Sequence, residues 1–173
     1  MQSKPIPSQL DTQPLMPQEK KIVSWQTAQN MTEQWKSHGD RVVFTNGCFD
    51  LLHPGHTSLL SQAKQAGDHL IVGLSTDSAV KRVKGPHRPI QKERDRALVL
   101  ASLAAVDLVV LFDQDGPLEL IETLKPDVFA KGADYTLDKI WGASFVQSYG
   151  GQILLVDLVE GQSTTGIVTR IAG

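Results

Sequence analysis

The stretch from Arg41 to His56 reads RVVFTNGCFDLLHPGH and decides the fold class of this 173-residue chain. Its first five residues, 41–45, are mostly apolar and predict a buried strand that runs into a polar, glycine-containing turn. Pro54 suits the first turn of a helix, where its missing N–H costs no hydrogen bond. The sequence therefore predicts a strand, a turn and a helix, with His53 and His56 at the start of that helix.

The two histidines predict a phosphate site. They stand three positions apart and therefore lie on one face of the expected helix. A helix start offers partial positive charge and free backbone donors, and imidazoles beside it can donate to phosphate oxygens. A capping or surface role would explain one histidine but explains the pair less well. Zinc is disfavoured because two ligands do not make a site, and no cysteine or third histidine stands at ligand spacing nearby.

Strands and helices alternate along the rest of the chain. Periodicity and capping residues predict helices over 24–38, 53–66, 78–83, 91–104, 117–124 and 139–149, and a last one from 164 or 165. Strands are expected over 41–45, 69–74, 108–112, 127–130 and 153–156. Apolar runs without alternation, as in 70–72, are typical of parallel strands covered on both faces. Because crossovers are right-handed, we predict an α/β fold with a doubly wound, five-stranded parallel sheet.

Composition indicates a globular protein. The hydrophobic fraction is 40% and the formal net charge is −2, so no general basic surface for nucleic acid and no membrane span is expected. Cys48 is the only cysteine, which excludes an intramolecular disulfide, and we interpret it as a small buried residue. Residues 1–19 carry four prolines and predict a flexible tail before a single domain over 20–173. The N-terminus does not resemble a signal peptide, so we expect a cytoplasmic protein.

Ligands of such a sheet bind outside the carboxyl ends of the strands. That edge is expected to carry the segments 45–56, 75–88, 112–116, 131–135 and 157–165, where polar residues and glycines concentrate. Neither GxxxxGK[ST] nor GxGxxG follows the first strand, which disfavours P-loop kinases and dinucleotide dehydrogenases.

Three further groups on this edge could bind a polyanion. Lys81 and Lys84 belong to a basic stretch, which could equally be a solvated loop. Gly132 permits close backbone approach and Asp134 could bind ribose or a metal, although both residues are also ordinary turn formers. The segment 163–165 offers three hydroxyls at a helix start, which is more than N-capping requires.

Four motifs in order, TNGCFDLLHPGH, LSTDSAVKRVKG, KGADYT and EGQSTTGIV, carry a resemblance over about residues 20–171. The chain resembles the nucleotidyltransferases of the cytidylyltransferase type, which have a Rossmann-like fold of the HIGH superfamily. It resembles the bacterial heptose 1-phosphate adenylyltransferases of lipopolysaccharide inner-core synthesis more closely. The resemblance implies Mg²⁺-dependent transfer of AMP from ATP to heptose 1-phosphate, which gives ADP-heptose and pyrophosphate. It also implies a homodimer and a separate sugar kinase that makes the acceptor.

The resemblance further implies roles for individual residues. The catalytic residues would be His53, His56 and Lys84. The nucleotide would be bound by Thr45, Asn46, Gly47, Phe49, Arg96, Lys131, Gly132, Asp134, Tyr135, Gly161, Ser163, Thr164 and Thr165. Lys81 and Arg88 would bind the acceptor phosphate, and no metal ligand is assigned. Arg94 is an alternative to Arg96, and both could instead be exposed charges on a helix. The missing side chain of Gly47 would let backbone approach the nucleotide.

One departure bears on the choice of substrate. Many relatives of the cytidylyltransferase type carry an arginine shortly before the ST pair, whereas this chain has VEGQ at 159–162, which favours the heptose group. Two alternatives stay open: a cytidylyltransferase acting on glycerol 3-phosphate or a similar alcohol phosphate, and a non-catalytic nucleotide-binding module. The second has less support, because a simple binder needs no pair of histidines at the scissile phosphate.

Overall fold

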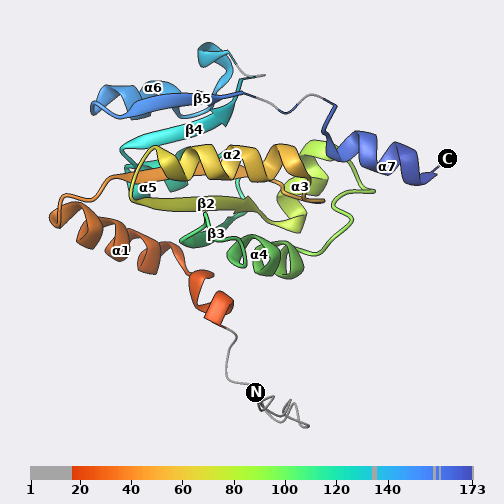
Figure 1. Cartoon of the computed structure of the whole chain (residues 1–173), viewed down its shortest axis with the longest axis horizontal. Coiled ribbons are helices and arrows are strands. Elements are labelled where there is room, and N and C mark those ends of the chain that lie inside the picture. The colour runs from red at the N-terminus through yellow and green to blue at the C-terminus, as the bar shows by residue number, and fades with distance from the viewer. Residues whose placement is uncertain (1–16, 134–135, 158, 160, 173) are drawn as a thin grey trace, which may run out of the picture.

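The computed structural model describes residues 17–133, 136–157, 159 and 161–172 (Figure 1). The strands are β1 (Val42–Gly47), β2 (His69–Ser75), β3 (Leu108–Phe112), β4 (Val128–Gly132) and β5 (Gln152–Val156). The helices are η1 (Pro17–Lys21), α1 (Trp25–Ser37), α2 (Pro54–Gln65), α3 (Asp77–Lys84), α4 (Glu93–Ala101), α5 (Leu118–Leu124), η2 (Leu137–Lys139), α6 (Ala143–Ser148) and α7 (Thr164–Ala172). Each strand and helix that the sequence predicts therefore has a counterpart, most of them within a few residues of the expected ends.

The five strands form one parallel sheet in the order β3-β2-β1-β4-β5. The chain builds outward from β1 to β3 and then crosses back to place β4 on the other side of β1. The strand order thus reverses beside β1, which is where sheets of this kind bind their ligands. The predicted doubly wound α/β fold is confirmed, and β1 with its following loop lies at its centre.

Two cores cover the two faces of the sheet. Side chains alternate along β1, so that Val42 and Phe44 pack with α1, α5 and α6, whereas Val43 packs with α2 and α4. All three residues have no exposed surface. Burial on both faces explains why the strands read as continuous apolar runs. Among the described residues, no helix is both long and apolar enough to cross a membrane.

The N-terminal boundary differs from the prediction. The flexible tail was expected to reach residue 19, but the 3-10 helix η1 already begins at Pro17. Lys21 donates to the carbonyl of Val106 at 2.7 Å, and the backbone N–H of Val23 donates to the carbonyl of Val109 at 3.0 Å. These contacts along β3 hold the segment in place. The rest of the predicted tail, residues 1–16, lies outside the described residues.

Candidate active site

The HPGH segment opens α2 as predicted. Pro54 occupies the first turn, and His53 is the N-cap residue with an extended backbone. The rings of His53 and His56 lie with their centroids 3.8 Å apart at an interplanar angle of 31°, and the ring of Phe49 is 5.2 Å from that of His56. The fold therefore places both imidazoles side by side at the carboxyl end of β1.

Both imidazoles carry a buried nitrogen without a partner. Within the described part of the chain, His53 Nδ1 and His56 Nδ1 have no hydrogen bond, and the side-chain oxygen of Asn46 is in the same state. A buried polar atom without a partner costs free energy, so such atoms gathered in one place point to a ligand that supplies the missing bonds.

The two histidines are neutral at physiological pH. Burial lowers the pKa of His56 to about 4, helped by the charges of His53 and Lys84 and opposed by a hydrogen bond to the Leu51 backbone. Burial also lowers the pKa of His53. Each imidazole thus offers one N–H donor and one acceptor nitrogen.

Phe49 shapes the loop between β1 and α2. Its φ of 44° lies in the left-handed region, which is uncommon for a bulky residue. Its ring fills the space beside Gly47, where an added Cβ would lie 3.0 Å from Phe49 Cε2. A glycine at position 47 therefore leaves room for this ring. The sequence predicted another reason for this glycine, the close approach of a nucleotide.

Asp50 holds the same loop to the segment before α4. Its carboxylate is 3% exposed and accepts bonds from the backbone of Ile90 at 2.8 Å and of Gln91 at 3.0 Å, and from Arg88 at 2.9 Å. Burial alone would raise the pKa of Asp50, but the bonds from Gln91, Arg88 and Ile90 outweigh it and lower the pKa. Arg88 is engaged by this pair and does not line the cavity described below.

Arg96 is buried beneath the site, with 1% of its surface exposed. Its guanidinium donates to the carbonyls of Cys48 at 2.5 Å, Ser75 at 2.9 Å and Gln91 at 3.0 Å, and to the carboxylate of Asp77 at 2.6 Å. One side chain thus ties the ends of β1 and β2 to α3 and to the segment before α4. In the structure the guanidinium of Arg96 thus bonds to groups of the protein itself, whereas the sequence predicted that it contacts the nucleotide.

The last helix, α7, brings its hydroxyls to the HPGH segment. Thr164 donates its hydroxyl to the carbonyl of Leu51 at 3.3 Å, and Ser163 Oγ accepts from the N–H of Gly166 at 3.0 Å. The close fit extends to Gly55, where an added Cβ would lie 3.5 Å from the Cβ of Gln162 and 3.0 Å from the ring of His53. The start of α7 therefore packs against the loop that carries the histidines.

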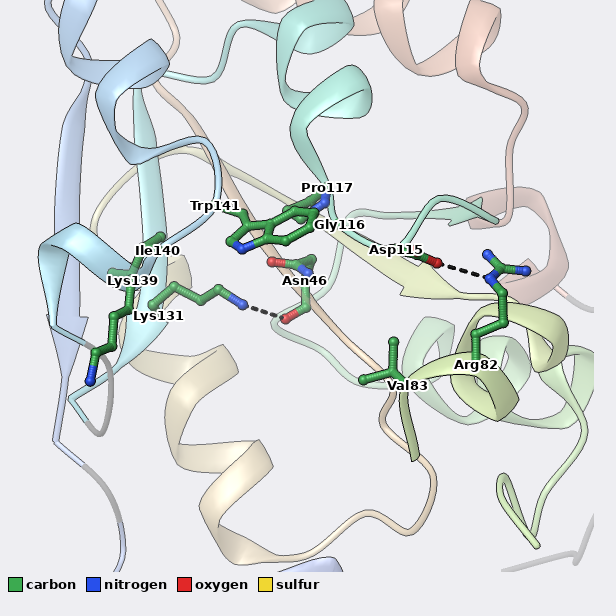
Figure 2. A pocket seen from close by; sticks show the side chains of 10 residues that line it. All are labelled: Asn46, Arg82, Val83, Asp115, Gly116, Pro117, Lys131, Lys139, Ile140 and Trp141. Carbon is green, nitrogen blue, oxygen red and sulfur yellow. Dashed lines mark hydrogen bonds and ion pairs between the residues drawn. The ribbon is translucent and has the colours of Figure 1, made fainter. Parts of the chain in front are cut away.

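These elements surround a cavity of about 560 Å³ at the carboxyl edge of the sheet. Its lining includes most of the predicted site: Asn46, Gly47, Phe49, His53, His56, Lys84, Lys131, Gly132, Ser163, Thr164 and Thr165. A second cavity of about 400 Å³ adjoins it and shares four of its lining residues, Asn46, Val83, Asp115 and Lys131 (Figure 2).

Five predicted residues do not line the large cavity: Thr45, Lys81, Arg88, Arg96 and Gly161. Thr45 is fully buried and donates its hydroxyl to the carbonyl of Ala130 at 2.9 Å, which joins β1 to β4. Lys81 is exposed on α3, and Gly161 provides a turn with a φ of 72° before α7. Asp134 and Tyr135 lie outside the described residues.

Several lining residues were not predicted. Gln114 and Asp115 follow β3 on the expected edge, so their position was the available signal. Gln162 stands directly before the predicted hydroxyls. Trp141 gave no signal, because the sequence assigned it to a helix over 139–149 that the structure divides into η2 and α6. Cys48 also lines the cavity and is half-buried rather than buried.

The fold and the site thus combine a doubly wound parallel sheet with a histidine pair at one helix start and hydroxyls at another, an arrangement suited to binding phosphate groups. The chain matches the cytidylyltransferase-like family over residues 44–164. Since this match spans well over half of its length, the chain belongs to that family.

The relatives agree with this assignment. The bifunctional protein HldE of Gluconobacter oxydans (strain 621H) is 60% identical over 153 residues, which cover 88% of this chain and 32% of that protein. HldE of Caulobacter vibrioides (strain ATCC 19089 / CIP 103742 / CB 15) is 59% identical over 155 residues, with 90% and 32% covered. The chain therefore spans about a third of the length of these curated relatives.

Solved structures show the same fold. The lipopolysaccharide core biosynthesis protein from Thermoplasma volcanium GSS1 aligns with a TM-score of 0.58 and 29% identity, over 72% of this chain and 100% of that one. Pantothenate synthetase from Thermus thermophilus aligns with a TM-score of 0.55 over 80% of this chain and 62% of its own. At 19% identity, the second likeness concerns the fold alone.

Proposed function

We propose that this nucleotidyltransferase transfers AMP from ATP to heptose 1-phosphate, giving ADP-heptose and pyrophosphate for lipopolysaccharide inner-core synthesis. One observation carries the proposal: two buried imidazole nitrogens without partners line the same cavity as the hydroxyls at the start of α7. The name of the Thermoplasma volcanium protein and the identity to the HldE proteins support the pathway.

The reaction is an in-line displacement at phosphorus. An oxygen of the acceptor phosphate forms a bond to the α-phosphorus of ATP, and the bond from that phosphorus to the oxygen of the departing pyrophosphate breaks. The protein has to align two polyanions and stabilise the charge that develops, with no covalent intermediate on the chain. Neutral His53, and neutral His56 in the tautomer that carries its proton on Nδ1, would donate N–H bonds to the α-phosphate oxygens, and these bonds strengthen in the transition state.

The other residues hold the nucleotide and offset its charge. The hydroxyls of Ser163, Thr164 and Thr165 and the helix start behind them suit the β- and γ-phosphates. Lys84 lines the same cavity as the two histidines, and its charge lowers the pKa of His56, so its ammonium would offset the charge of phosphates bound at the imidazoles. Lys131 and Gly132 complete the side of the cavity next to β4.

The donor set fits Mg²⁺ that arrives bound to ATP. Among the described residues, no three His, Cys, Asp or Glu side chains are grouped as a metal centre. Asp50, which lines the cavity, already accepts three internal hydrogen bonds. Mg²⁺ keeps several waters and binds substrate phosphates with few protein ligands, and the unpartnered side-chain oxygen of Asn46 suits one such position. The metal would neutralise charge on the phosphates of the nucleotide.

The remaining parts of the proposal concern the setting of the enzyme. A sugar kinase would supply heptose 1-phosphate, and the HldE relatives are named bifunctional. A homodimer and a cytoplasmic location stay predictions. Trp25 and Trp35 of α1 pack against the core of their own chain.

A donor-by-acceptor assay tests the proposal. The protein is incubated with Mg²⁺ and either ATP or CTP, and with D-glycero-β-D-manno-heptose 1-phosphate or glycerol 3-phosphate, while pyrophosphate release is followed. We expect turnover with ATP and the heptose phosphate. Turnover of CTP with glycerol 3-phosphate alone would support the cytidylyltransferase alternative, and nucleotide binding without turnover of any pair would support a binding module.

A further inference from the structure

The second cavity adjoins the predicted nucleotide site, with which it shares Asn46 and Lys131. Its volume of about 400 Å³ falls in the range of small-ligand sites, roughly 300–1,000 Å³. Figure 2 shows that its walls come from the end of α3, the loop before α5 and the segment between η2 and α6. It opens beside the large cavity, since Asn46, Val83, Asp115 and Lys131 line both.

Trp141 is the main apolar group of this cavity. It is 64% exposed, whereas Trp25 donates its indole N–H to the Leu111 carbonyl and Trp35 stacks on His69 at 3.9 Å. The Trp141 ring nevertheless has a fixed support, because a Cβ added at Gly116 would lie 2.1 Å from its Cε3 atom. A large aromatic ring is thus held beside a glycine backbone while most of its surface stays accessible.

Charged groups also line this cavity. Asp115 accepts from Arg82 Nε at 2.8 Å and remains 63% exposed, so its carboxylate can accept further bonds. Lys131 lies at the border of the two cavities, with its ammonium 3.4 Å from the Asn46 carbonyl and 5.7 Å from the centre of the Phe129 ring. In Figure 2, Trp141 and Lys131 approach Asn46 from one side, and the Arg82–Asp115 pair forms the opposite wall.

We propose that this cavity binds the sugar ring of the acceptor, with Trp141 as a specificity-determining residue. The inference rests on the proposed function. A sugar ring has an apolar C–H face with partial positive charge and a rim of hydroxyls, which match the negative face of an indole and a nearby carboxylate. With the ring against Trp141 and hydroxyls on Asp115, the phosphate of the acceptor lies at the shared border, beside Lys131 and toward the histidines.

This arrangement predicts which acceptors the cavity prefers. A short linear alcohol phosphate can place its phosphate beside Lys131, but it has no ring to cover the indole. The cavity therefore favours a cyclic sugar 1-phosphate over glycerol 3-phosphate, and the contact with Trp141 supplies part of that preference.

The test compares Trp141→Ala, Trp141→Phe and the control Val99→Ala, which removes a 44% exposed apolar side chain from α4. For Trp141→Ala we expect the KM of D-glycero-β-D-manno-heptose 1-phosphate to rise about five- to tenfold, the range expected for loss of an aromatic contact. The KM of ATP should stay within about twofold, since the nucleotide does not contact this wall. Trp141→Phe should recover most of the loss, and Val99→Ala should behave as wild type.

A second variant, Asp115→Asn, keeps the size of the side chain while it removes the charge that accepts hydroxyl bonds. We expect it to raise the KM of the sugar phosphate. The inhibition constant of glycerol 3-phosphate, added as a competitor, should stay unchanged. ATP binding by each variant, measured by calorimetry, verifies that the large cavity is intact.

Two failures are distinguishable. If the wild type does not turn over the sugar phosphate with ATP, the proposed function is wrong and this inference falls with it. If the wild type is active and Trp141→Ala and Asp115→Asn both keep its KM for the sugar phosphate, the proposed function stands and the sugar subsite is overturned.

Discussion

The hydroxyl of Thr164 donates to the carbonyl of Leu51 at 3.3 Å, although the two residues are 113 positions apart in the chain. Leu51 belongs to the loop that leads into the histidines, and Thr164 begins the last helix. The bond therefore joins the two motifs, TNGCFDLLHPGH and EGQSTTGIV, that would form the two halves of a nucleotidyl-transfer site.

Thr164→Val should weaken ATP binding, because it removes both this bond and a hydroxyl that suits the nucleotide phosphates. One neutral hydrogen bond contributes about 1 kcal/mol, so the KM of ATP should rise about fivefold. Thr123→Val is the matched control, since it removes a hydroxyl bonded at 2.8 Å to the Glu119 carbonyl on α5, remote from the cavity. Equal effects of both substitutions would contradict the proposed role of Thr164.

His56→Ala and His53→Ala should each lower kcat by about 10²–10³-fold, because donors to a developing charge act mainly in the transition state. The dissociation constant of ATP should change less than about threefold. His38→Ala serves as a control, since His38 is exposed at the end of α1. Kinetic assays measure kcat, and calorimetry measures the dissociation constant of ATP. Equal losses of turnover and of ATP binding would support simple binding.

The lowered pKa of His56 also predicts a pH dependence of stability. Folded His56 stays neutral down to about pH 4, whereas the unfolded imidazole takes up a proton near its ordinary value of 6.5. Between these values the unfolded state binds more protons, so the free energy of unfolding falls as the pH falls from about 6.5 toward 4. His56 contributes at most about 3 kcal/mol over this window.

Urea unfolding at about pH 7 and pH 5 checks this prediction. In His56→Gln the loss of stability between the two values should be smaller than in the wild type, because glutamine does not titrate. His53→Gln should act in the same direction, since burial lowers the pKa of His53 as well. If both variants lose as much unfolding free energy between the two pH values as the wild type does, the titration of these histidines does not cause the loss.

Arg96→Lys should destabilise the protein by about 2–3 kcal/mol, because a lysine cannot reach the several acceptors that the guanidinium joins. The KM of ATP and the KM of the sugar phosphate should both rise, because the ends of β1 and β2 lose the side chain that joins them. Arg94→Lys is the control: Arg94 is 82% exposed with a 3.8 Å contact to Glu19, and its change should stay within about 0.5 kcal/mol. Unfolding curves give the comparison, and lost ATP binding at unchanged stability would instead favour the nucleotide contact predicted from the sequence.

The sequence allowed the fold to be predicted because β1 to β4 are mostly buried, which gives apolar runs, and most helices carry a clear start or stop. The parallel sheet and the HPGH helix follow from such local signals. Their meeting with the hydroxyls of α7 could be predicted from the rule that ligands gather at the carboxyl ends of the strands. These are the parts that periodicity and topology determine.

The remaining parts depend on contacts that local sequence does not encode. An arginine on a helix can face a ligand or the protein interior, and only the packing of four segments around Arg96 decides for the interior. Thr45 likewise bonds to a neighbouring strand. Trp141 reaches its cavity because Gly116, 25 positions earlier, has no side chain to displace it.

The contacts of residues 22–25 with β3 have a consequence for self-association. β3 is an edge strand, and the carbonyls of Val109 and Leu111 on its outer side accept bonds from the Val23 N–H and the Trp25 indole. Open strand edges are the usual templates for pairing between chains, and this one is already occupied by the protein's own residues. Within the described part of the chain, a second molecule could extend the sheet only alongside β5.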